Sequence, residues 1–218
     1  MTSIKPILAC LSLGLLAACG NDDDRLLDAD MLGQVFNREE PVAATPAQTA
    51  NLVARALQSL NEPVMLTIIE DRKATAIMVP YGQNGPVQTW TTQEFQTVSF
   101  ERGVITATRG LGDDLMSAET TAVANALRSG GGTVNRVWRT LDGTNAVIEK
   151  TATCQISSAG AETITLASGA SLQTRRMVED CGDGIRNAYW LDGSGRVAQS
   201  RQWVGEKVGH VTQQVVRR

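Results

Sequence analysis

Acidic side chains behind a glycine-rich turn are the residues of this chain best suited to acid–base chemistry. Asp113 and Asp114 follow Gly110 and Gly112, and Glu119 comes shortly after them. A pair of carboxylates is sufficient for glycoside hydrolysis. The alternative is a turn into a helix, because carboxylates at a helix N-terminus are stabilised in their charged form. A catalytic acid has to keep its proton, so the pattern favours a structural role for these three residues.

The sequence contains few candidate residues for a metal site, a serine triad or a phosphate-binding loop. The chain has one histidine, His210, in a strand-like stretch near its end. This count excludes multi-histidine metal sites and leaves a serine triad a single candidate base. The run Gly130-Gly131-Gly132 lacks the Lys-Ser/Thr ending of a phosphate-binding loop and is typical of a linker. We therefore predict no catalytic residue, no metal and no cofactor.

The most specific chemical signal lies at the N-terminus. A short start with Lys5 leads into an apolar run at 7–18, and Leu16-Ala17-Ala18 precedes Cys19. This is the layout of a secretory signal peptide with a small-residue cleavage site, and its end resembles the lipobox of bacterial lipoproteins. A transmembrane helix would need roughly 20 apolar residues. The sequence predicts a signal peptide at 1–18 and lipidation of Cys19, with an ordinary signal peptide as the alternative.

Lipidation of Cys19 would determine where the protein works. Stable anchoring takes two or more acyl chains, and a diacylglyceryl-cysteine supplies them. The next residue is Gly20 rather than Asp, so the inner-membrane retention signal of enteric lipoproteins is absent and the outer membrane is favoured. We predict a lipidated N-terminus and acidic tether at 19–45, followed by a single β-rich domain at 46–218 that faces the periplasm.

Two cysteines remain for this domain, Cys154 and Cys181. Disulfides persist in an oxidising periplasm, and closing a loop of this length stabilises a fold by roughly 3–4 kcal/mol. A reactive thiol is the alternative. However, Glu179, Asp180 and Asp183 surround Cys181, whereas nucleophilic cysteines usually have cationic neighbours. The sequence therefore favours a structural disulfide.

Aromatic side chains are candidates for carbohydrate contact, because their amphipathic rings can stack on sugars. The candidates are Trp90, Trp138, Tyr189, Trp190 and Trp203. Trp138, Tyr189 and Trp190 are the predicted glycan contacts, because arginines alternate with aromatic residues in their segments. Core packing is the alternative in a chain with so few aromatic residues, and the pattern leaves both readings open.

The elements that must position these residues are mostly strands. A capping box at Thr45-Pro46-Ala47-Gln48 predicts a helix at 46–60, and 113–128 has helical composition. Strand-like stretches occupy 64–71, 74–82, 87–92, 96–110, 134–141, 144–156, 162–167, 171–180, 185–191, 196–204 and 210–216. Arg102-Gly103 and the Asp-Gly pairs at 142–143 and 192–193 predict hairpin turns. We predict a mainly β fold with two helical segments (α+β), an antiparallel open barrel or a sandwich-like sheet.

Two longer motifs carry a family resemblance. The first is GVITATRGLG at 103–112, and the second runs from Tyr189-Trp190 through Gly195-Arg196-Val197 to Ser200-Arg201-Gln202. Together with the lipobox and the first helix they resemble the YjbF family of lipoproteins, related to the group 4 capsule polysaccharide lipoprotein GfcB. The similarity covers about 19–215. The chain departs from the family at 203–205, where Trp-Val-Gly stands in place of a proline-containing segment.

The resemblance implies an outer-membrane lipoprotein that is a non-enzymatic accessory factor in exopolysaccharide or capsule secretion or assembly. Its expected partners are the membrane, through the lipid anchor, and polysaccharide or export-machinery proteins. A formal net charge of −3 without a basic stripe excludes nucleic acid. The family carries no established catalytic residues. The alternatives are a periplasmic carbohydrate-active enzyme that uses paired carboxylates and a chaperone for an outer-membrane barrel.

Overall fold

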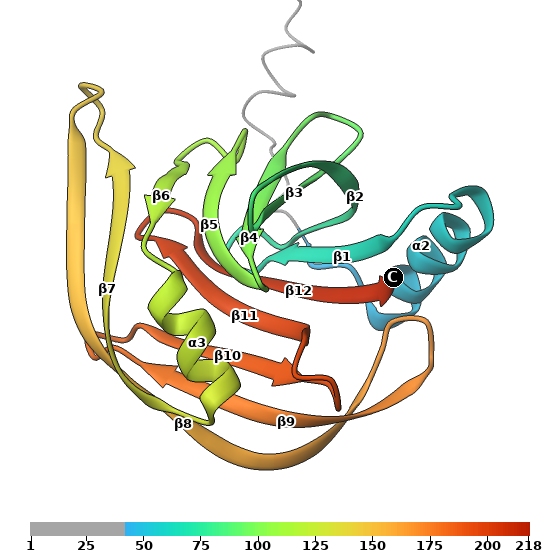
Figure 1. Ribbon diagram of the computed structural model, residues 1–218. Helices are drawn as coiled ribbons and strands as arrows, with labels where there is room; N and C mark the ends of the chain where they lie inside the picture. The colour runs from blue at the N-terminus through green and yellow to red at the C-terminus, as the bar shows by residue number, and fades with distance from the viewer. Residues whose placement is uncertain (1–41) are drawn as a thin grey trace, which may run out of the picture. The chain divides into compact units, whose positions relative to one another are not determined.

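The computed structural model describes residues 42–218, which lie within one compact unit. The predicted signal peptide, Cys19 and the tether up to residue 41 lie outside the described residues. Two helices and twelve strands form the described part (Figure 1). The helices are α2 (Pro46–Ser59) and α3 (Thr121–Ser129). The strands are β1 (Val64–Ile69), β2 (Ala74–Asn84), β3 (Val87–Thr91), β4 (Thr97–Glu101), β5 (Val104–Arg109), β6 (Leu115–Ala118), β7 (Gly132–Leu141), β8 (Val147–Thr165), β9 (Ser171–Asp180), β10 (Arg186–Leu191), β11 (Val197–Gly205) and β12 (Gly209–Arg217).

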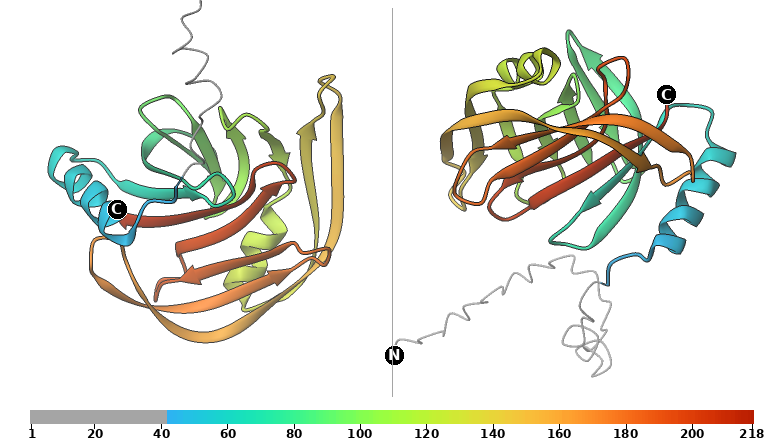
Figure 2. Two further views of the ribbon diagram at one scale, coloured as in Figure 1. Left: turned by 180° about the vertical axis from the view of Figure 1, so that it is seen from behind. Right: turned by 90° about the horizontal axis from the view of Figure 1, so that it is seen from below.

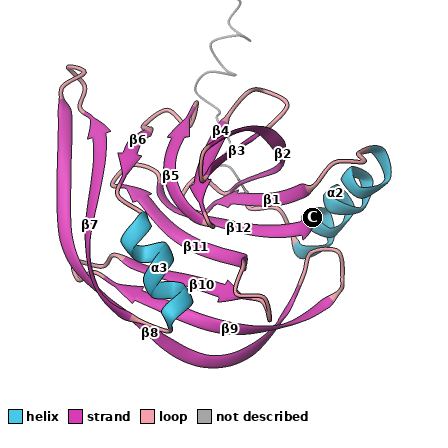
Figure 3. Ribbon diagram, in the orientation of Figure 1, coloured by secondary structure: helices cyan, strands magenta, loops and turns pink. Residues whose placement is uncertain are grey.

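All twelve strands belong to one sheet, and its antiparallel pairing confirms the prediction from the sequence. The strand order is β5-β4-β3-β2-β1-β12-β11-β10-β9-β8-β7-β6, so both edges come from consecutive strands of the chain. The sheet curls until these edges meet (Figures 1 and 3). Side chains bridge the seam: the Leu115 N–H donates to the Thr108 hydroxyl at 3.0 Å, and Arg109 donates to the Leu115 carbonyl at 3.0 Å. The result is a nearly closed barrel.

Bulges help to bend the strands into this curve, because an extra residue on one strand increases the local bend and twist. The pairing register shifts at several places, including 80–82 in β2, 99–100 in β4 and 158–160 in β8. The shift at 158–160 in β8 corrects a prediction from the sequence. The two strands predicted at 144–156 and 162–167 are one long strand, β8, because the ladder with β9 continues past a bulge where Gly160 has φ +100°.

The second predicted helix is confirmed only in its C-terminal half. In the predicted span 113–128, Leu115–Ala118 form strand β6, and the helix begins at Thr121. Leu115 is buried in the core, and Ser117 and Ala118 pair with β7. Helical composition gave way to tertiary pairing, which the local sequence does not reveal. The helix N-terminus is fixed from outside, because Thr120 and Thr121 donate hydroxyl hydrogen bonds to buried Glu101.

Helix α2 forms as predicted, with Thr45 and Gln48 closing the capping box. It lies beside the C-terminus (Figures 1 and 2). There Arg217 donates hydrogen bonds to the carbonyls of Leu57 and Leu60, which the helix end leaves without intrahelical partners. Neither α2 nor α3 is long and apolar enough to cross a membrane.

Candidate functional site

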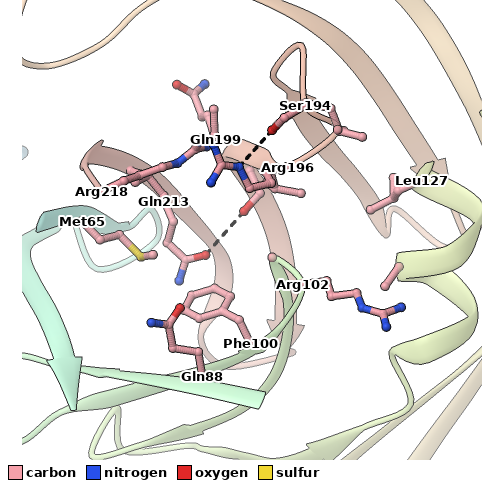
Figure 4. Close-up of a pocket in the computed structure, with 18 of the residues that line it drawn as sticks. Met65, Gln88, Phe100, Arg102, Leu127, Ser194, Arg196, Gln199, Gln213 and Arg218 are labelled. Carbon is pink, nitrogen blue, oxygen red and sulfur yellow. Dashed lines mark hydrogen bonds between the residues drawn. The ribbon is translucent and has the colours of Figure 1, made fainter. Parts of the chain in front are cut away.

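The described residues form a pocket of about 630 Å³. Its walls come from distant parts of the chain: β1, the β3–β4 pair, the C-terminal half of α3, the β10–β11 loop, and the strands β11 and β12 (Figure 4). Its volume lies within the range of about 300–1,000 Å³ that small-molecule sites occupy. The turn between β4 and β5 forms one side, where Gly103 packs so closely against Val197 that a Cβ would lie 2.6 Å from that side chain.

One wall of the pocket is apolar and partly aromatic. The side chains of Trp90 and Phe100 face inward from neighbouring strands, because residues on opposite sides of an antiparallel pair share a face when they are in register. Gln88 pairs directly with Phe100 and adds an exposed amide to the same wall. Met65, Leu127 and Leu191 complete the apolar surface. Such a wall suits the apolar face of a ring.

Among the described residues, four arginines and no acidic residue line the pocket. They are Arg102, Arg128, Arg196 and Arg218, all exposed. Arg196 and Arg218 lie on the β11–β12 side, and Arg102 lies across from them near α3 (Figure 4). Among the described residues, Arg102 and Arg128 have no carboxylate within 4 Å, and Arg102 donates only to Asn125, at 3.2 Å. The rim is therefore a cationic surface around an apolar wall.

Asp192 lies behind this rim and holds two of its arginines. It forms ion pairs with Arg196, at 3.8 Å, and with Arg218. Its other oxygen accepts the backbone N–H groups of Ser194 and Arg196 and the Ser194 hydroxyl. Burial favours the neutral acid, but the hydrogen bonds from Ser194, Arg218 and Arg196 outweigh it and hold the pKa of Asp192 far below its usual range. The carboxylate stays charged and orients the arginines.

An unpaired amide lies inside the pocket. Gln213 is 3% exposed and lines the cavity, yet its Nε2 has no hydrogen-bond partner within residues 42–218. Its Oε1 lies 3.5 Å from the Ser200 hydroxyl, and its amide projects into the space between Met65 and Gln88 (Figure 4). Buried polar groups in native proteins nearly always have partners. A buried donor without a partner, on a side chain that lines a cavity, is a group that a ligand oxygen can satisfy.

A chain of polar side chains continues from this amide into the barrel. Gln202 donates to the Ser200 hydroxyl and to the Gly103 carbonyl, both at 2.9 Å, and accepts the Ile105 N–H at 2.9 Å. One buried glutamine of β11 thereby satisfies two backbone groups of the β4–β5 hairpin on the opposite side of the barrel. These bonds fix the distance between two walls of the pocket.

The predicted disulfide is present beside a buried ion pair. Cys154 and Cys181 are bonded and link β8 to the β9–β10 turn. Glu179, fully buried, lies 3.4 Å from Arg136 and accepts a hydrogen bond from Tyr189 at 2.7 Å. Ligand atoms of the two cysteines and Glu179 lie within 4.8 Å of one another. Because the sulfurs are bonded to each other and Glu179 already has partners, this cluster serves the core.

The three predicted glycan contacts are buried. Trp138 is 1% exposed, Tyr189 is 0% exposed and Trp190 is 9% exposed. Trp138 packs edge-on against Trp203, and burial together with the charge of Glu179 raises the pKa of Tyr189 well above its usual value. None of the three side chains lines the pocket described above. The core interpretation describes them correctly, because their strands turn the aromatic rings toward apolar neighbours.

The candidate carboxylates lie outside the pocket lining. Asp114 accepts the backbone N–H groups of Gly110 and Leu111, which fixes the turn between the seam strands. Asp113 pairs with Lys207 at 2.9 Å, and Glu119 pairs with Arg139 at 3.0 Å. The expected helix N-terminus is not there, because a strand follows. All three groups have structural partners.

His210 also has a structural setting. It pairs with Trp203 across β11 and β12, and its Nε2 lies 3.2 Å from the Arg186 carbonyl. Burial, followed by the positive charge of Arg201, lowers its pKa. No serine hydroxyl is among its hydrogen-bond partners in the described residues.

No local pattern in the sequence indicates the pocket. Trp90 stood among the aromatic candidates, but nothing local connects it with Arg196 or Gln213. The available signals were the two family motifs, because Gly103 of the first and Gly195-Arg196-Val197 and Ser200 of the second line the cavity. Assembling the site needed the barrel topology.

This chain is similar in fold to a solved structure and in sequence to a known family. The crystal structure of the hypothetical lipoprotein YmcC from Escherichia coli (K12) is similar, with a TM-score of 0.64 and 21% sequence identity over 79% of this chain and 93% of that chain. This likeness shows the fold. No curated protein matches the sequence. A family model described as "Group 4 capsule polysaccharide lipoprotein gfcB, YjbF" matches residues 29–216, so the chain belongs to the YjbF family of group 4 capsule polysaccharide lipoproteins.

Proposed function

We propose that this protein is an outer-membrane lipoprotein, anchored through Cys19 and facing the periplasm, that acts as a non-enzymatic accessory factor in the secretion or assembly of an exopolysaccharide or capsule. Membership of the family supports a capsule-related role in the cell envelope. The observation that carries the accessory role is the open pocket, whose apolar wall, cationic rim and inward amide are binding groups.

A binding role also agrees with the positions of the acidic side chains. Asp113, Asp114 and Glu119, the carboxylates considered for catalysis, are held by ion pairs or by turn hydrogen bonds away from the pocket. The pocket lining contributes arginines and amides rather than a pair of carboxylates. The chemistry it offers is attraction and hydrogen bonding.

Deletion of the gene tests the role. In a strain that makes the polymer, we expect loss of surface polymer with retention inside the envelope, and restoration by the full-length gene. A Cys19→Ala version should not restore export, because the domain would no longer be held at the membrane. Normal surface polymer in the deletion strain would refute the role.

The non-enzymatic part is tested with the purified lipidated protein and the polymer from the same strain. We expect the chain-length distribution to stay unchanged after prolonged incubation, while the polymer is retained by immobilised protein. Shortening of the polymer by the wild type, abolished by Asp113→Asn or Glu119→Gln, would establish the enzyme alternative instead.

A further inference from the structure

We propose that the pocket binds a short acidic segment of a polysaccharide, in which a carboxylate-bearing sugar pairs with the arginine rim. The inference rests on the proposed function and names the ligand class of its site. Three features of the pocket carry it: the charge of the rim, the aromatic wall and the unpaired amide of Gln213.

The rim sets the charge of the ligand. Arg102 and Arg128 lack acidic partners among the described residues, and Asp192 holds Arg196 and Arg218 from outside the lining. Guanidinium groups bind carboxylates through paired, charge-assisted hydrogen bonds. A neutral ligand would leave the positive charge of this rim without a counter-charge, whereas an anionic ligand is attracted by every arginine around the opening.

Gln213 requires a polar group on the part of the ligand that enters the pocket. Its Nε2 is buried without a partner, and filling the cavity with hydrocarbon would leave it unpaired at a cost of about 1–3 kcal/mol. An acyl chain has no acceptor to offer there. A sugar hydroxyl or ring oxygen accepts the hydrogen bond, so the amide favours a saccharide over a lipid tail.

The aromatic wall completes the fit. Trp90 and Phe100, each 5% exposed, line the cavity, and Gln88 adds an exposed amide within the same wall. A sugar ring has one apolar face and polar edges, which matches an aromatic wall bordered by amides. A bare inorganic anion would use the rim alone and leave the wall and Gln213 without contacts.

Direct binding to the full-length lipidated protein in non-ionic detergent tests the proposal. The probes are trigalacturonate, an acidic hyaluronan tetrasaccharide and fragments of the native polymer, with maltotriose as the neutral comparison and inorganic phosphate and laurate as the other anions. We expect at least one acidic saccharide to bind saturably, at least tenfold more tightly than maltotriose, phosphate or laurate. Failure of all acidic saccharides, or stronger binding of laurate, overturns the proposal.

Two variants separate a binding role from a structural one. Arg196→Gln with Arg102→Gln should weaken acidic saccharide binding at least tenfold, whereas Arg55→Gln, an exposed arginine on α2, should leave it unchanged. Gln213→Leu should weaken binding at least threefold without lowering the melting temperature, because it removes an unpaired buried donor. Unchanged affinity in Gln213→Leu, in a protein that still melts cooperatively, would contradict the proposed contact.

The same variants distinguish this inference from the proposed function. If gene deletion abolishes export but the pocket variants restore it fully, the acidic-saccharide site fails and the accessory role stands. If acidic saccharides bind as expected but deletion leaves export intact, the accessory role fails and the site stands.

Discussion

At the scale of single residues, Asp192 shows how a turn residue also shapes the pocket. The Asp-Gly pair predicted a hairpin, and the carboxylate does close the β10–β11 turn by accepting two backbone N–H groups. Its second oxygen holds Arg196 and Arg218 at the rim. The sequence showed the first role through local spacing. The second depends on the chain end returning beside the turn, which local spacing does not report.

Acid should weaken the contribution of Asp192 to stability. Because its folded pKa lies below that of the unfolded chain, this contribution is present above about pH 4 and is lost as pH falls toward the folded pKa. Asp192→Asn should therefore melt at a lower temperature than the wild type at pH 7, and the difference should narrow below about pH 4. Thermal melts from pH 7 to pH 3 measure it.

Asp142 provides the matched control. It makes the same turn contacts, with the N–H groups of Thr144 and Ala146, but has no ion pair with an arginine among the described residues. Asp142→Asn should lower the melting temperature less than Asp192→Asn at pH 7. Equal effects, or an Asp192→Asn difference independent of pH, would show that the arginine contacts do not stabilise the fold.

At the scale of elements, most strands were predictable and their continuity was not. Alternation and β-branched residues located nearly every strand, including the hairpin at Arg102-Gly103. The break expected within β8 is a bulge, and the first part of the helix expected at 113–128 is strand β6. Both errors have one cause: whether a segment pairs depends on the strand beside it and not on its own composition.

Gln202 connects two elements that are far apart in the sequence, β11 and the β4–β5 hairpin. Gln202→Leu should destabilise the domain by about 1–3 kcal/mol for each backbone group left unpaired. Denaturant unfolding measures the loss. Gln173→Leu, at an exposed position of β9, is the control and should change stability by less than about 0.5 kcal/mol. A Gln202→Leu protein as stable as this control would show that the cross-barrel bonds contribute nothing net.

At the scale of the whole molecule, the disulfide reinforces a barrel whose seam is closed by side chains rather than by a ladder. Its cysteines are 27 residues apart, so the bond stabilises the fold by about 3–4 kcal/mol through loop closure. Cys154→Ala with Cys181→Ala should lower the melting temperature by roughly 10 °C. Wild type melted with a reductant should approach the same value. A double variant that melts with the wild type would refute the stabilising role.

The pocket itself belongs to this largest scale. Trp90, Gln213 and Arg196 come from three regions of the chain, and only the closing of the sheet brings them around one cavity. Composition and spacing could indicate which residues were available for binding. They could not select Trp90, which lines the pocket, over Trp138, which is equally a core residue but lies outside the lining.

Crosslinking in living cells tests most directly whether this pocket contacts the polymer. A benzophenone amino acid is placed at Gln88, an exposed residue of the pocket wall, in a polymer-producing strain and is activated by light. The same probe at Tyr81, an exposed side chain on β2 outside the lining, is the control. We expect a high-mass, polymer-containing adduct at position 88 and little polymer adduct at position 81. Adducts that contain only lipid or protein, or equal polymer capture at both positions, would contradict this expectation.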